Sequence, residues 1–109
     1  MGVNPKDLQK MMKQVQEMQQ QVTAIQDQLA GQTFEGSAGG GVVKATLLGT
    51  GELVSVEIDP QVADPDDTEM LGDLVVAAVN QAWRSAQETA GERMGGLASG
   101  LGLPPGLLG

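Results

Sequence analysis

The chain has 109 residues, a formal net charge of −8, a pI near 4.1, and no His, Cys or Tyr. This length allows one small domain, and the lack of Cys excludes disulfides and thiolate metal sites. With Phe34 and Trp83 as its aromatic residues, the core must be aliphatic and thin, so we expect a second subunit to complete it.

Residues 5–30 are predicted to form a long helix. Asn4 and Pro5 are typical of a helix start, and Gly31 is typical of a helix end. Apolar residues recur in this segment at alternating spacings of three and four, a seven-residue repeat. They are Leu8, Met11, Val15, Met18, Val22, Ile25 and Leu29. These residues are predicted to form a seam for dimerisation or helix packing. The helix is either a core helix packed on its own chain or a coiled-coil-like arm. We favour the arm, because the rest of the chain is too short to cover so long a seam.

Three short strands are predicted next. The first spans residues 32–36, and residues 41–48 and 52–59 form a hairpin rich in β-branched residues. The glycine-rich residues 36–41 are predicted to be a flexible connection. In the third strand Val54, Val56 and Ile58 are expected to share one face, and the proline that follows Asp59 ends the strand.

A second helix is predicted over residues 67–94. Asp66 and Glu69 have the spacing of a capping box at its start. Apolar and small residues follow at helical spacing: Leu71, Leu74, Val75, Ala78, Ala82, Ala86 and Thr89. Trp83, beside this stripe, is expected to be partly buried. The single domain then covers residues 1–94, and the Gly- and Pro-rich residues 95–109 are predicted to be a flexible tail.

The sequence indicates neither catalysis nor a cofactor. The glycines at 36–41 have no Walker Lys-Ser/Thr pair and precede a strand, so they are interpreted as turn glycines rather than a phosphate loop. The acidic run that starts at Asp64 lacks the Gly and Glu positions of a calcium-binding loop. With no His, Cys or Tyr and no Ser in a nucleophile-elbow pattern, we expect no enzyme activity, metal or cofactor.

Targeting signals are equally weak. No apolar run approaches the ~18 residues of a membrane span, and the N-terminus has no apolar signal-peptide stretch. Lys6 stands where an N-myristoylation pattern has Ser or Thr. We therefore expect a soluble cytoplasmic protein with no membrane partner.

Four blocks spread over nearly the whole chain carry a family resemblance. In order they are FEGSAGGGVVK (residues 34–44), VEIDP (56–60), LGDLVVAAVNQA (71–82) and LPPG (103–106). Together they resemble the YbaB/EbfC family of nucleoid-associated proteins. The resemblance implies an α+β fold with a long N-terminal helix, a three-stranded antiparallel sheet and a C-terminal helix. It further implies a tweezer-like homodimer, in which the sheets of two chains pair and the long helices project as arms.

The same resemblance implies a cytoplasmic, nucleoid-associated protein that binds DNA and affects its conformation and gene expression. The residues place any DNA contact at the start of the first helix. Residues 1–30 carry Lys6, Lys10 and Lys13 against three carboxylates, whereas the whole net charge of −8 lies in residues 31–109. Their spacings of four and three put the lysines on one helical face, pointing away from the seam. The alternative is that they are ordinary solvated surface.

Two chains would present six such lysines, joined by Arg84 and Arg93 of the second helix. Phosphate contacts of this kind predict weak, salt-sensitive binding of duplex DNA with little sequence preference. No aromatic residue is placed for base stacking. The rival hypothesis is a dimeric interaction module for other proteins with no direct DNA role, using the eight acidic residues between Glu52 and Asp73.

Overall fold

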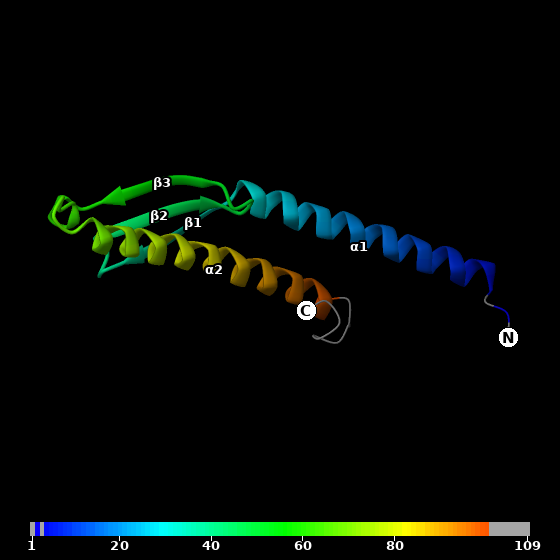
Figure 1. The fold of residues 1–109 in the computed structure, drawn as a ribbon. Coiled ribbons are helices and arrows are strands. Elements are labelled where there is room, and N and C mark those ends of the chain that lie inside the picture. Colours follow the sequence, from blue (N-terminus) through cyan, green and yellow to red (C-terminus); the bar gives the residue numbers. More distant parts are fainter. Residues whose placement is uncertain (1, 3, 101–109) are drawn as a thin grey trace.

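The computed structural model describes residue 2 and residues 4–100. Its elements in chain order are α1 (Pro5–Gly31), β1 (Thr33–Ala38), β2 (Val43–Leu48), β3 (Leu53–Ile58), the 3-10 turn η1 (Pro60–Val62) and α2 (Thr68–Gly100). The three strands form one antiparallel sheet in the order β1-β2-β3. The predicted α+β fold class is confirmed. The molecule is elongated, 75 × 23 × 17 Å, because the outer part of α1 projects beyond the sheet (Figure 1).

Local sequence signals set both ends of α1. The Asn4 side chain accepts a hydrogen bond from the Lys6 amide at 3.1 Å, and proline occupies the first helical position. At the other end the Gln32 amide donates to the Leu29 carbonyl at 3.2 Å. The 27 residues between these caps make a helix of about 40 Å.

One face of the sheet packs directly on α2. Phe34 of β1 and Val43, Ala45 and Leu47 of β2 are buried beneath this helix. The helix contributes small residues to the contact: Ala78, Ala82 and Ala86. A Cβ atom at Gly36 would overlap the backbone of α2. The contact is therefore backbone against backbone, which the small alanine side chains of α2 allow.

The first strand is longer than predicted. It continues through residues 36–38, which pair with β2 in the register Gly36↔Ala45, Ser37↔Lys44 and Ala38↔Val43. The prediction of a flexible connection over residues 36–41 is wrong for this half, because Gly36 is required where the strand touches α2. The remaining glycines, residues 39–41, have positive φ angles of 63°, 75° and 98° and form the turn.

Both ends of α2 differ from prediction. The side chain that caps its first turn is Asp67, which accepts from the Met70 amide at 3.2 Å, whereas a capping box between Asp66 and Glu69 was expected. The helix also continues to Gly100 rather than ending near residue 94. Glycine inside a helix costs about 1 kcal/mol relative to alanine, which weakens a helix without ending it. Residues 95–100 are thus helical, and the rest of the predicted tail lies outside the described residues.

The third strand is the least covered element of the sheet. Val56 and Ile58 pair with the buried Ala45 and Val43, so they share the face turned toward α2. Val54 has no partner, because a bulge between Leu53 and Ser55 interrupts the register. The helix packs on β1 and β2 and does not extend over β3. Leu53, Val54 and Ile58 are therefore exposed, and the outer edge of this strand pairs with no other described strand.

Candidate nucleic-acid interface

The base of α1 is fixed to the body by the residue that follows the helix. The Gln32 carbonyl accepts from the Gly49 amide at 3.0 Å, and its side-chain oxygen accepts from the Arg93 guanidinium at 2.9 Å. A Cβ atom at Gly49 would overlap the Leu29 carbonyl, so the turn between β2 and β3 lies directly on the end of α1. Three elements thus meet at Gln32 and set the direction in which the arm leaves the body.

The seam of α1 changes character along the helix. Leu29 is buried in a cluster with Phe34 and Ala86, and Ile25 packs against it. Met18 and Val22 are half-buried. By contrast, the three outermost seam residues are 51–57% exposed: Leu8, Met11 and Val15. The inner half of α1 therefore packs on its own chain, and its outer half projects from the body (Figure 1).

The three lysines lie on this arm. Lys6, Lys10 and Lys13 are all exposed and occupy the first three turns of α1. Unpaired amides and the helix dipole add positive potential at the same end of the helix. At 1.5 Å per residue, Lys13 lies about 24 Å along the axis from Leu29, where the helix meets the body. The arrangement is a cationic tip held away from the rest of the chain.

The two arginines of α2 lie in different environments. Arg84 is exposed and follows Trp83, whose ring lies 3.3 Å from the Cβ position of Gly51, in the turn between β2 and β3. Arg93 is half-buried and donates to Gln32 at the base of the arm. The structure places Lys6, Lys10 and Lys13 on the arm and both arginines on the body.

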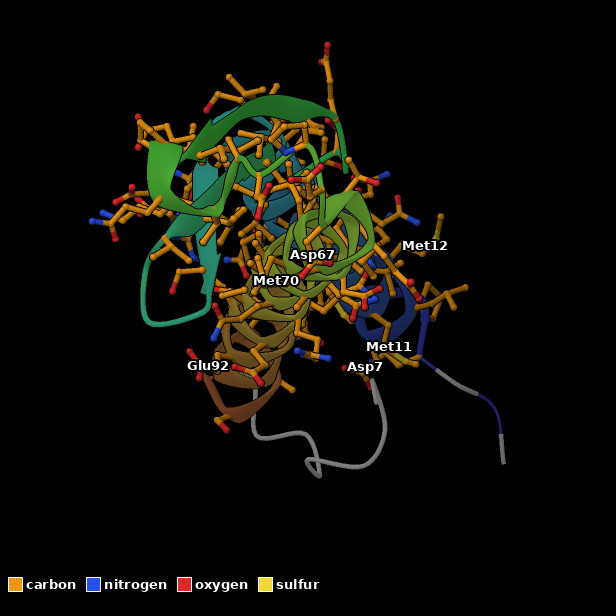
Figure 2. All side chains as sticks on the ribbon, turned by 60° about the vertical axis from the view of Figure 1, so that its left-hand side comes forward. Asp7, Met11, Met12, Asp67, Met70 and Glu92 are labelled. Atoms are coloured by element: carbon orange, nitrogen blue, oxygen red, sulfur yellow. The ribbon has the colours of Figure 1, made fainter. Side chains whose placement is uncertain are left out.

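The acidic residues gather at the end of the body away from the arm. Figure 2 looks onto this end, where Asp67 and Met70 open α2, while Met11 and Met12 of the arm lie behind it. Three carboxylates of this region serve backbone groups: Asp59 accepts from the Gln61 amide, Asp64 from the Asp66 amide, and Asp67 from the Met70 amide. The chain therefore carries its positive tip and its most acidic region at opposite ends (Figure 1).

Over residue 2 and residues 4–100, no three His, Cys, Asp or Glu side chains converge in a way that would hold a metal ion. In the same part of the chain no helix combines the length and apolar character needed to cross a membrane.

Sequence reasoning missed two glutamines that organise the site. Gln32 anchors the arm, and the Gln81 side chain accepts from the Ser37 amide at 2.6 Å on the edge of β1. Neither carries a local signal, because glutamine is abundant in this chain and both contacts join residues more than 40 positions apart. The bulge in β3 also has no marker in the sequence.

Comparison with known proteins relates this geometry to other chains. Residues 4–101 match the model of the YbaB/EbfC DNA-binding family. A nucleoid-associated protein of Nocardia farcinica is 50% identical over 103 residues, 94% of this chain and 93% of the relative. One of Pelotomaculum thermopropionicum is 47% identical over 98 residues, 90% and 93% of the two chains. The crystal structure of an uncharacterized protein from Helicobacter pylori shares the fold, with a TM-score of 0.60, 20% identity, and coverage of 81% of this chain and 89% of that one.

Proposed function

The chain belongs to the YbaB/EbfC DNA-binding family, and we propose on that premise that it binds duplex DNA through the tip of α1 as a nucleoid-associated protein. One observation supports this site above others. Lys6, Lys10 and Lys13 are exposed on one face of a helix that projects from the body, at the end where the helix dipole is positive. No other part of the described chain has three cations so close together in sequence.

Charge separation explains how so acidic a chain approaches DNA. At physiological salt the Debye length is about 8 Å, far less than the 75 Å length of the molecule. Repulsion between the acidic end and a duplex is therefore screened when the tip makes contact. The same repulsion disfavours any approach by the body, so the protein meets DNA with the arm first.

The proposed DNA contact at the tip of α1 contains no group that distinguishes one base from another. Its contacts are lysine ammonium groups. Phe34 is buried, and Trp83, although 38% exposed, lies on the body beside Gly51 rather than at the tip. Lysine contacts to phosphate carry no sequence information, so binding has little sequence preference. Two arms holding one duplex would act on its path and bending, which is how such a protein alters DNA conformation and gene expression.

We propose that the binding unit is a homodimer assembled along β3. This strand exposes Leu53, Val54 and Ile58 and also presents a free edge, a combination that favours pairing with another chain. The edge of β1 differs, since Gln81 satisfies the Ser37 amide there. Two chains joined at β3 would present six tip lysines, and six phosphate contacts give a slope of log K against log salt of about −5.

The DNA site is tested by neutralising Lys6, Lys10 and Lys13 to Gln and titrating fluorescent duplex DNA at low and high salt. We expect weak binding by the unchanged protein, at least about tenfold weaker binding by the variant, and a much shallower salt slope. The matched control adds the same negative charge to exposed positions of the body outside β3: Gln61→Glu, Asn80→Glu and Gln87→Glu. If the control weakens DNA binding as much as the lysine variant does, overall repulsion governs affinity and the tip is not the site.

The dimer is tested by light scattering. We expect the unchanged protein to have twice the chain mass of 11.2 kDa, and Val54→Lys to shift it toward the mass of one chain. Val54 is 55% exposed, so a lysine there leaves the folded chain intact. Val76→Lys on α2 is the matched control, because Val76 is similarly exposed, at 59%, but lies outside the sheet. A Val54→Lys protein that remains dimeric excludes this interface.

The rival function, an acidic protein-binding module, has its surface at the opposite end of the molecule. Three of its carboxylates already cap backbone amides, which explains part of the acidic run without a partner. The same titration separates the two functions. Absence of DNA binding at low salt, together with retained dimerisation, would favour the protein-binding module.

A further inference from the structure

We propose that the outer half of α1 pairs with the outer half of α1 from a second copy, antiparallel and through the apolar face that the chain leaves uncovered. We define this face, the arm stripe, as Leu8, Met11, Met12 and Val15. All four are 51–59% exposed on a helix otherwise rich in glutamine. A shallow groove of about 330 Å³ follows them, lined by the same four residues and Gln16. Such a groove is where side chains of a neighbouring helix would insert.

The repeat itself indicates a helix as the occupant. The arm stripe continues, at spacings of three and four, the seam that reaches the buried Leu29. A seven-residue repeat keeps one narrow apolar seam aligned with a partner helix. The inner part of this seam already packs on its own chain, where α1 lies against α2, β1 and β2. The outer part extends past that contact with the same pattern.

The flanks of the stripe favour a second copy over a charged partner. They carry Gln9, Gln14 and Gln16, with Asp7 as the one charged residue among them. A side-chain amide both donates and accepts, so glutamines of two copies can hydrogen-bond to one another in either helix direction. A charged partner would find few groups of opposite sign beside the apolar residues.

The positions of the lysines argue against a lipid surface as the occupant. At 100° per residue, Lys6, Lys10 and Lys13 lie about 150–170° from the centre of the stripe. A helix with its stripe in a membrane would turn these cations away from the headgroups. The body, with its net charge of −8, is repelled by an anionic bilayer. The same geometry leaves the lysines accessible while the stripe is covered.

Charge on the body selects the antiparallel direction. Parallel arms would place the bodies of two different dimers side by side, each body with the net charge of −8 found in residues 31–109 and without the strand pairing at β3 to offset the repulsion. Antiparallel arms place the bodies at opposite ends of the overlap. The bodies are then separated by more than a Debye length, so salt screens the repulsion between them. An overlap centred between residues 11 and 12 sets Leu8 against Val15 of the second copy and Met11 against Met12, so every stripe residue meets another.

The strength of this contact is modest. Four side chains per arm bury less surface than the ~800 Å² per partner of a stable interface. Association through a single arm pair therefore depends on protein concentration. The overall affinity is higher when both arms of one dimer pair with other arms at the same time, because the second contact is then intramolecular. The arm pair would join DNA-binding units to one another while their lysines remain on the outside.

Cysteine cross-linking tests both the contact and its direction, because the full chain has no Cys. Leu8→Cys protein carrying a size tag is mixed with Val15→Cys protein and exposed to a mild oxidant without DNA. We expect the mixed disulfide to form about tenfold faster than the disulfide of Gln20→Cys protein with itself. Gln20 is exposed and lies about 130° around the helix from the centre of the stripe, outside the proposed contact, so it measures random collision.

Each other result overturns the proposal in a distinct way. Leu8→Cys protein that cross-links chiefly with itself would show parallel arms. Rates equal to that of Gln20→Cys would show that a second copy does not cover the stripe. Loss of the mixed disulfide on adding phosphatidylserine vesicles, with the protein sedimenting on them, would assign the stripe to lipid. Omitting DNA keeps the outcome independent of whether the lysines bind it.

Discussion

The two halves of α1 carry the same seven-residue repeat, but their apolar residues differ in burial. At the inner end Leu29 is 7% exposed and contacts Phe34 and Ala86, while at the outer end Leu8 is 51% exposed. The repeat specifies which face of the helix is apolar, but the length of the body decides how much of that face is covered. The inner half therefore serves folding and the outer half is available for binding.

The largest effect is expected where the body is packed most closely. Gly36→Ala should lower the free energy of unfolding by at least about 3 kcal/mol, because the new Cβ overlaps the backbone of α2, which cannot move aside as a side chain can. Chemical denaturation at fixed protein concentration measures this. The same change at Gly91, an open position inside α2, should instead stabilise by about 0.5–1 kcal/mol. Equal effects at the two sites would show that β1 does not touch the helix backbone.

A matched pair of truncations tests the two halves of α1 directly. Leu29→Ala should cost about 2–4 kcal/mol, since it leaves a cavity beside Phe34 and Ala86. Leu8→Ala should change the free energy of unfolding by less than about 0.5 kcal/mol, because the side chain is exposed. Both are read from the same denaturation curves. A large loss from Leu8→Ala would mean that the outer arm folds as part of the body.

The two arginines of α2 differ in their contact with the base of the arm. Arg93→Met should lower the free energy of unfolding by about 1–2 kcal/mol, because it removes the hydrogen bond to Gln32. Arg84→Met, at an exposed position, should leave stability unchanged within about 0.5 kcal/mol. Anisotropy titration with duplex DNA completes the test. A stronger loss of DNA affinity in Arg93→Met than in the triple lysine variant would move the interface to the body.

The helix caps give the smallest effects. Asp67→Ala should cost about 1 kcal/mol of global stability, because α2 unfolds together with the sheet. Asn4→Ala removes an equivalent cap from α1 but should leave the unfolding midpoint unchanged, because the arm frays locally. Amide hydrogen exchange at the first turn of α1 should instead become faster. A lowered midpoint in Asn4→Ala would show that the tip is coupled to the body.

Element order and the apolar faces could be predicted because each has a local cause. Asn4 and Pro5 start α1, the β-branched runs form the hairpin, and the alanine stripe of α2 faces β1 and β2. The errors occurred where a distant contact outweighs a local signal. Gly36 resembles a linker residue in the sequence, yet it is part of β1 because the backbone of α2 lies against it.

The candidate site divides in the same way. The spacing of Lys6, Lys10 and Lys13 was sufficient to place them on one helical face, because helical geometry is local. Neither the tie between Arg93 and Gln32 nor the exposure of β3 could be predicted, because one joins residues 61 positions apart and the other depends on where α2 stops covering the sheet.

By itself, the sequence determined the elements, their apolar faces and a neutral first helix with a cationic start, since composition and spacing act over a few residues. The tertiary structure alone decided that only the inner half of α1 is covered and that β3 remains open. The physical reason is the thin core, which is complete over β1 and β2 and has too little apolar surface to cover either the outer arm or the third strand.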